Sequence, residues 1–258
     1  LMTGTDDEKV SEDDDSNEVE IGARFVRPLG SHSTLELMAS QQLGWLDSRE
    51  HSMQEDEEES FEEKTRTGES IARLDLTHEW SERLSLASSL EGAFNFLQSN
   101  AALVENGTPV MLPGSDVRIE EQRIEAALGA TWKLTEAWML EGGMRVEHST
   151  INQTGDTPLE RRFTYPKPRI AVRWDANDHN QLRLSFSREV GQLDFGDFVA
   201  SASLGSGLVT AGNAELEPDK TWRMTTAWEH HFWTDAAFTI SWTHDRITDV
   251  VDRVLVAT

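Results

Sequence analysis

The sequence contains no cysteine and few basic residues. The missing thiols exclude disulfide bonds, cysteine nucleophiles, thiolate zinc sites and iron–sulfur clusters. Lys and Arg number 23 against 47 Asp and Glu, so the formal net charge is −24. A chain this acidic repels phosphate backbones, and it has no Lys/Arg stripe with interleaved aromatic residues. Nucleic acid is therefore not expected among its partners.

Long apolar runs are missing as well. No apolar stretch of the sequence approaches the roughly 18 residues that a transmembrane helix needs. This excludes a helical membrane span. It leaves membrane-crossing β-strands open, because such strands carry alternating rather than continuous hydrophobicity.

What the sequence has instead is an alternation of apolar and polar side chains with a period of two. Between Ile71 and Trp80 the even positions are mostly apolar, while Arg73, Asp75 and Thr77 stand at odd positions. This pattern predicts a strand with one apolar and one polar face. It recurs along the chain and predicts ten strands in all, several of them longer than the usual mode of about 5 to 6 residues.

The predicted connections alternate between short and long. Short turns are expected near residues 28–34, 81–83, 133–136, 175–180 and 233–236. Long polar connections are expected at 47–66, 98–117, 150–161 and 188–218. An outer-membrane barrel has short periplasmic turns and long extracellular loops, so this alternation favours an up-and-down barrel of that kind.

The placement of aromatic residues agrees with this orientation. Several lie within a few residues of the short turns, where an interfacial girdle is expected: Trp80, Trp132, Trp138, Trp174, Phe232 and Trp233. The polar partners of the apolar residues would line a polar interior, among them Arg73, Asp75, Glu91, Asn95, Glu125, Arg145, Glu147, Arg173 and Arg223. A soluble β-sandwich with one exposed face remains the alternative.

Two segments hold most of the negative charge. Residues 1–18 contain eight acidic residues and one Lys, and residues 50–63 contain eight more with no Lys or Arg. Together they account for 15 of the 24 net negative charges. Like charges so close together do not pack against one another, so we interpret residues 1–18 and 47–66 as acidic, solvated extracellular loops.

Catalytic and metal-binding motifs are weak. The patterns G-x-S-x-G, H-E-x-x-H, G-x-G-x-x-G and the P-loop are missing from the sequence. His230 and His231 are adjacent, so in a strand they face opposite sides and do not chelate one metal. We therefore expect no enzyme activity, no metal site and no cofactor.

Two stretches resemble a known family. Residues 165–174 with 181–189 are similar to paired barrel strands of TonB-dependent outer-membrane receptors, and residues 187–198 to the start of the loop that follows them. Gly212-Asn213-Ala214-Glu215-Leu216-Glu217-Pro218 resembles the segment that closes that loop, although Asp219 stands where Glu is commoner. The specific resemblance covers about residues 165–250.

The resemblance implies a 22-stranded barrel plugged by an N-terminal domain. It also implies energy-dependent uptake of a scarce ligand, such as a siderophore, metal chelate or other nutrient, across the bacterial outer membrane. A plug domain and an energy-coupling box are not found in this sequence. We therefore interpret residues 1–258 as a partial barrel domain carrying about ten antiparallel strands, which would leave two unpaired sheet edges. A passive porin-like barrel and a rim-active hydrolase like the omptins remain alternatives.

The family's placement of ligand contacts implies a candidate site. Extracellular loops and the upper lumen carry such contacts in this family, so the resemblance points to the loop at 188–214. The candidate ligand-binding residues are Arg188, Asp194, Phe195, Asp197 and Phe198. In the alternative interpretation, the apolar residues pack the loop onto the barrel and the aspartates cap its turns. The implied partners are a small-molecule or metal-chelate ligand, outer-membrane lipid and the TonB complex, the last through a preceding region.

Overall fold

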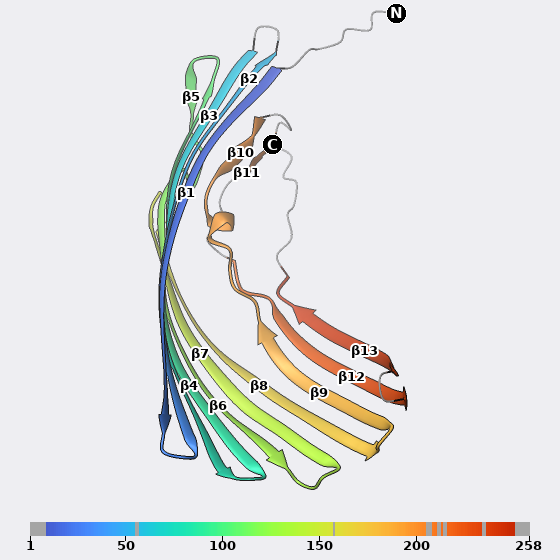
Figure 1. The fold of residues 1–258 in the computed structure, drawn as a ribbon. Coiled ribbons are helices and arrows are strands. Elements are labelled where there is room, and N and C mark those ends of the chain that lie inside the picture. The colour runs from blue at the N-terminus through green and yellow to red at the C-terminus, as the bar shows by residue number, and fades with distance from the viewer. Residues whose placement is uncertain are drawn as a thin grey trace, which may run out of the picture.

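A computed structural model describes residues 9–54, 57–156, 158–204, 208–210, 213, 216–233 and 236–250. Most of these residues form one antiparallel sheet, which curves into an open trough (Figure 1). Ten described strands follow one another along the sheet in chain order, and each is antiparallel to the next. The predicted all-β, up-and-down barrel segment of about ten strands is confirmed.

The described strands are longer than the sequence pattern indicated. In chain order they are β1 (Lys9–Leu29), β2 (Ser33–Gln54), β3 (Glu57–Ser81), β4 (Leu84–Glu105), β6 (Asp116–Lys133), β7 (Trp138–Gly155), β8 (Leu159–Asn177), β9 (Asn180–Val190), β12 (Lys220–Trp233) and β13 (Ala236–Thr248). A short strand, β5 (Thr108–Val110), pairs with the end of β4. A separate hairpin consists of β10 (Ser201–Ser203) and β11 (Leu208–Thr210). Strands β1 and β13 end the main path, which agrees with the expected two unpaired edges.

The short turns lie together at one end of the sheet, as predicted (Figure 1). The long connections differ from the prediction. At 98–117 and 150–161 the strands continue through most of the expected loop, whereas the connection between β9 and β12 is long, as expected. The strands continue to pair there because the hydrogen bonds between strands are made by the backbone. They form whether or not apolar and polar side chains alternate, and that alternation is the signal by which the sequence predicts a strand.

The two acidic segments are also strands over their described parts, so their interpretation as loops is wrong there. Residues 9–18 belong to β1, and β2 and β3 pair up to Gln54 and Glu57. The β1 end and the β2–β3 hairpin lie side by side, at the end of the sheet opposite the short turns (Figure 1). Carboxylates on successive residues of a strand point to opposite faces, and this separates charges that looked crowded in sequence.

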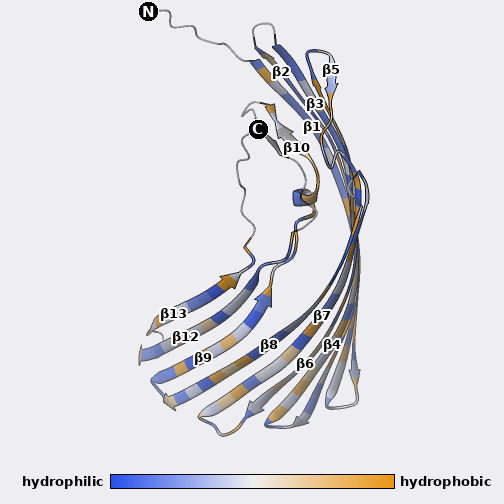
Figure 2. Ribbon diagram, turned by 180° about the vertical axis from the view of Figure 1, so that it is seen from behind, coloured by the Kyte–Doolittle hydropathy of each residue, from blue (hydrophilic) through white to orange (hydrophobic). Residues whose placement is uncertain are grey.

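The register gives the sheet one polar and one apolar face. Residues 84, 86, 90 and 94 of β4 share the convex face with residues 124, 126, 128 and 130 of β6, and all are apolar. On each of the ten long strands the apolar residues of this face lie toward the short turns, and polar residues follow beyond them. Figure 2 shows this change along the strands, from mixed orange and blue near the turns to mainly blue at the far ends of β1–β3.

The concave face carries a network of ion pairs. Arg73 pairs with Asp75 at 2.8 Å on β3, and Arg123 of β6 pairs with Glu91 of β4 at 3.2 Å. Lys167 of β8 contacts Glu147 of β7 at 2.6 Å. These residues come from the polar positions of the alternation, so the predicted polar face is confirmed as the inner face of the trough. In the described part of the chain, no helix is long and apolar enough to span a membrane.

The long connection folds back into the trough and packs on its inner wall. It contains a short 3₁₀ helix, η1 (Phe195–Phe198), whose N-terminus is capped by the Asp194 carboxylate accepting a hydrogen bond from the Gly196 amide at 2.8 Å. Phe198 is 2% exposed and packs with a cluster on β4, β6 and β7: Leu97, Val117, Ile119 and Ile151. A second cluster, Phe61, Leu103, Leu112, Ala200 and Leu204, holds the next part of the connection. The apolar loop residues therefore act as anchors.

We predict that Phe198→Ala releases this connection from the wall. Replacing a fully buried Phe by Ala costs about 3 to 5 kcal/mol, and here the cost falls on the attachment of one loop and not on the sheet. Limited proteolysis of the full-length protein should show faster cleavage within residues 191–204 and unchanged protection of the strands. Met111→Ala, at a side chain that is 95% exposed, is the control. Equal cleavage rates in both variants would contradict the anchoring role.

Candidate functional site

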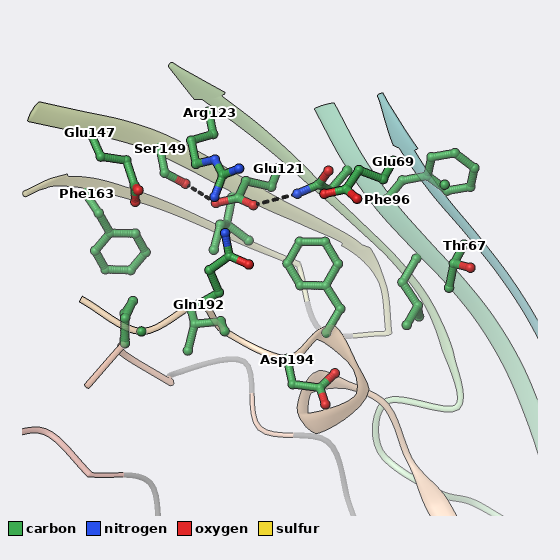
Figure 3. Close-up of a pocket in the computed structure, with 18 of the residues that line it drawn as sticks. Thr67, Glu69, Phe96, Glu121, Arg123, Glu147, Ser149, Phe163, Gln192 and Asp194 are labelled. Atoms are coloured by element: carbon green, nitrogen blue, oxygen red, sulfur yellow. Dashed lines mark hydrogen bonds between the residues drawn. The ribbon is translucent and has the colours of Figure 1, made fainter. Parts of the chain in front are cut away.

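A cavity of about 300 Å³ lies between the connection and the inner wall of the trough. This volume is at the lower end of the range of small-molecule sites. The wall is built by β2, β3, β4, β6, β7 and β8, and the roof by residues 191–195 and Pro218. Its polar lining residues are Gln42, Thr67, Glu69, Asn95, Glu121, Arg123, Glu147, Ser149, Tyr165, Gln192 and Asp194. Figure 3 shows most of them converging from the wall and the loop.

Glu121 is the centre of the wall's hydrogen bonds. Its two carboxylate oxygens accept hydrogen bonds from the Ser149 hydroxyl and, at 3.1 Å, from the Asn95 side-chain amide (Figure 3). These three residues lie on β6, β7 and β4, and register brings them to the same face. The two donors fix the carboxylate, which therefore faces the cavity in one orientation.

The charges lining the cavity are unevenly paired. Glu147, which is 8% exposed, is neutralised by Lys167, and Arg123 is engaged by Glu91. The Arg123 Nε–H has no hydrogen-bond acceptor, and the Glu69 carboxylate has no ion-pair partner in the described part of the chain. Among the described lining residues Arg123 is the one cation, and it is already paired, so the cavity carries excess negative charge. It favours a cationic or neutral, hydrogen-bonding ligand.

The roof depends on a close backbone approach at Gly191. The Gly191 amide donates to the Asp219 carbonyl at 2.9 Å, which ties the start of the connection to its end. A β-carbon at position 191 would lie 1.9 Å from the Asp219 side-chain oxygen, so any larger residue there would require the Asp219 side chain to move. From this tie Gln192 reaches toward Glu121 and Arg123 (Figure 3).

The five candidate residues from the sequence separate into three groups. Asp194 and Phe195 line the cavity. Phe198 is buried in the anchoring cluster and Asp197 lies in η1, and neither is among the lining residues. Arg188 does not reach the cavity. Its guanidinium lies 5.8 Å from the centre of the Trp222 ring, on the convex side of β9 and β12.

Most of the wall residues were not candidates in the sequence. Glu121, Arg123, Ser149 and Tyr165 stand at inward positions of strands that were themselves predicted. Because they alternate with outward residues, the sequence predicts that they lie on the inner face. No sequence signal showed that the connection would fold over them. Among the described residues, no group of three or more His, Asp or Glu side chains is arranged to hold a metal ion.

A family model described as "TonB dependent receptor-like, beta-barrel" matches residues 14–258. The chain belongs to the TonB-dependent receptor β-barrel family. Members of this family are bacterial outer-membrane proteins and transport receptors, and they are not enzymes. The resemblance that the sequence indicated, and the expectation of no enzyme activity, are confirmed by this match.

Solved structures with the same fold include three receptors. The copper transporter OprC aligns with a TM-score of 0.67 at 16% identity, over 90% of this chain and 39% of that one. The ferric-catecholate import receptor Fiu from E. coli K12 gives 0.63 at 11%, over 91% and 41%. The siderophore receptor PiuA from Acinetobacter baumannii gives 0.64 at 10%, over 89% and 40%. The chain thus spans about two-fifths of their length. No curated protein matches by sequence.

We predict that Ser149→Ala weakens the inner wall. It removes a charge-assisted hydrogen bond to Glu121 and leaves that oxygen unsatisfied, at a cost of about 1.5 to 3 kcal/mol. Urea unfolding of the full-length barrel in detergent should show a lower midpoint. Ser185→Ala is the control, since Ser185 also faces the trough but makes no hydrogen bond to the described residues. A midpoint equal to that of the control would contradict the role of Glu121 as the centre of the wall.

Proposed function

We propose that this chain is part of an outer-membrane receptor that binds a scarce ligand on the concave side and imports it with energy from the TonB system. The family match over residues 14–258 is the observation that carries this proposal. The roofed cavity on the inner wall supports it, since it offers a ligand-sized space inside the trough, against the middle of β2–β4 and the far parts of β6–β8. The match also favours this function over the porin-like and omptin-like alternatives.

The charge of the inner wall supports a cationic or neutral ligand. Beyond the ion-pair network, the inward positions of β1–β3 carry Glu18, Glu20, Glu50, Glu59, Glu63 and Glu69. The basic residues of the same stretches, Arg49, Lys64 and Arg66, occupy outward positions. An acidic wall raises the local concentration of cations and repels anionic chelates. The acidic segments, read as extracellular in the sequence, would thus belong to the ligand's entry path.

Energy-dependent uptake tests the proposed function. We expect the full-length protein, expressed in a bacterium without its own receptors, to accumulate at least one labelled probe from copper(II), ferric citrate, a ferric catecholate and haem. Accumulation should stop when an uncoupler removes the proton gradient or when TonB is deleted. Uptake that persists under both conditions would contradict the receptor and indicate a passive barrel.

Removing negative charge from the cavity tests whether the ligand is cationic or neutral. We expect the double variant Glu121→Gln/Asp194→Asn to bind hexaamminecobalt(III) about tenfold more weakly, because it removes two negative charges facing the site. Equilibrium dialysis of the full-length protein measures this change. Glu229→Gln, which removes an inward charge near the short turns, is the control.

Ferric citrate, an anionic complex, serves as the probe of opposite charge to hexaamminecobalt(III). Its binding should be weak in the unmodified protein and should not fall in the double variant. Tighter binding of ferric citrate than of the cationic complex by the unmodified protein would contradict a cationic or neutral ligand.

A further inference from the structure

Two arginines flank a tryptophan on the convex face of the last three strands. Register places Arg188 of β9 opposite Trp222 of β12, and Trp222 opposite Arg246 of β13. Directly paired residues project to the same face of an antiparallel sheet. The neighbouring Arg223 projects to the other face, where it pairs with Glu189 and Asp245. The three side chains therefore form one row, Arg188–Trp222–Arg246, on the outer wall.

The row has hydrogen-bonding capacity that the described residues do not use. The Arg188 guanidinium packs toward the Trp222 ring and donates through Nη1 to the Pro166 carbonyl at 3.0 Å, while its Nη2 donates to no described residue. Arg246 is exposed and has no ion-pair or hydrogen-bond partner in the described ranges. Adjacent strands lie about 4.8 Å apart, so the two arginines arise about 10 Å from each other. Guanidinium groups at this spacing reach one anion above the ring.

No carboxylate of the described residues forms an ion pair with Arg188 or Arg246. The row toward the short turns is Phe186, Met224 and His244, and the row on the other side is Val190, Lys220 and Thr248. Lys220 is occupied, since its ammonium contacts Asp249 at 2.7 Å and lies 5.7 Å from the centre of the Tyr165 ring. In a chain of net charge −24, these two outer-face arginines, which pair with no carboxylate among the described residues, form a patch of opposite charge.

The row lies where the apolar part of the convex face ends. Toward the short turns the same face carries Leu182, Leu184 and Phe186 on β9, Met224 and Trp228 on β12, and Phe238, Ile240 and Trp242 on β13. Phe186 stacks on Trp222, with ring centres 5.1 Å apart and planes 17° apart. Trp is enriched at the boundary between hydrocarbon and headgroups, and basic side chains just beyond it contact anionic headgroups. The row thus has the chemistry of a membrane boundary.

We propose that Arg188 and Arg246, on either side of Trp222, bind a phosphate group of an anionic glycolipid in the outer leaflet of the outer membrane. This inference rests on the proposed outer-membrane location, with the short turns on the periplasmic side. The acyl chains would then lie along the apolar strip of β9, β12 and β13, while the sugar phosphate meets the two guanidinium groups. Charge complementarity and the position of the row at the end of this strip support this occupant.

Lipid retention by the purified full-length receptor tests the site. The receptor is titrated in detergent with diphosphorylated lipid A, and bound lipid is counted by native mass spectrometry. Each arginine near a membrane surface contributes about 1 kcal/mol, so we expect Arg246→Gln to weaken retention about fivefold and Arg188→Gln/Arg246→Gln about thirtyfold. Arg246→Gln alone keeps the test valid if the loss of the Arg188–Pro166 hydrogen bond disturbs folding.

Three comparisons decide the outcome. Arg162→Gln, at an exposed outer-wall arginine that pairs with Glu160, should retain the lipid as the unmodified receptor does. Dephosphorylated lipid A and phosphatidylglycerol should bind weakly. Equal retention of either lipid, or an unchanged affinity in Arg246→Gln, would overturn the proposal. The assay uses no transported ligand, so a failure of uptake bears on the proposed function and a failure of retention bears on this site.

Discussion

Continuous hydrogen bonding between neighbouring strands is the constraint on which the rest of the structure depends. Once β4 pairs with β6 in a fixed register, every side chain on both strands is assigned to one of two faces, and a shift by one residue would exchange those faces. A one-residue shift of β6 would place Arg123 and Glu125 on the apolar surface. The ion pairs on the concave side therefore stabilise the same register as the apolar residues on the convex side.

That register also separates the charge of the chain by face. The net charge of −24 says little by itself, because Glu59 and Glu63 project inward while Lys64 and Arg66 of the same strand project outward. The inner wall beyond the ion-pair network is consequently acidic, and the outer wall holds cations at the end of its apolar strip. One sequence thus presents different chemistry to a ligand inside the trough and to lipid outside it, with no change in backbone structure.

The sequence predicted the parts of the fold where polarity and geometry agree. In β3 from Ile71 to Trp80 the apolar side faces the convex surface, so alternation located both the strand and its faces. From Glu57 to Arg66 every residue of the same strand except Phe61 is polar, so the sequence shows no alternation there although pairing continues. Asp194 and Phe195 were identified as site residues through family resemblance. Glu121 and Ser149 were missed because their importance arises only when a connection distant in sequence covers them.

The cavity therefore depends on burial more than on any polar group that lines it. Asn95, Glu121 and Ser149 would form a solvated patch on an open wall if the connection were elsewhere, and water would weaken their interactions with a ligand. Phe198 inserts among Leu97, Val117, Ile119 and Ile151, and the Gly191–Asp219 backbone tie closes the connection at its base. These apolar and backbone contacts hold Gln192 and Asp194 over the carboxylates. The wall supplies the charge, and the loop's anchors reduce the solvent that would otherwise screen it.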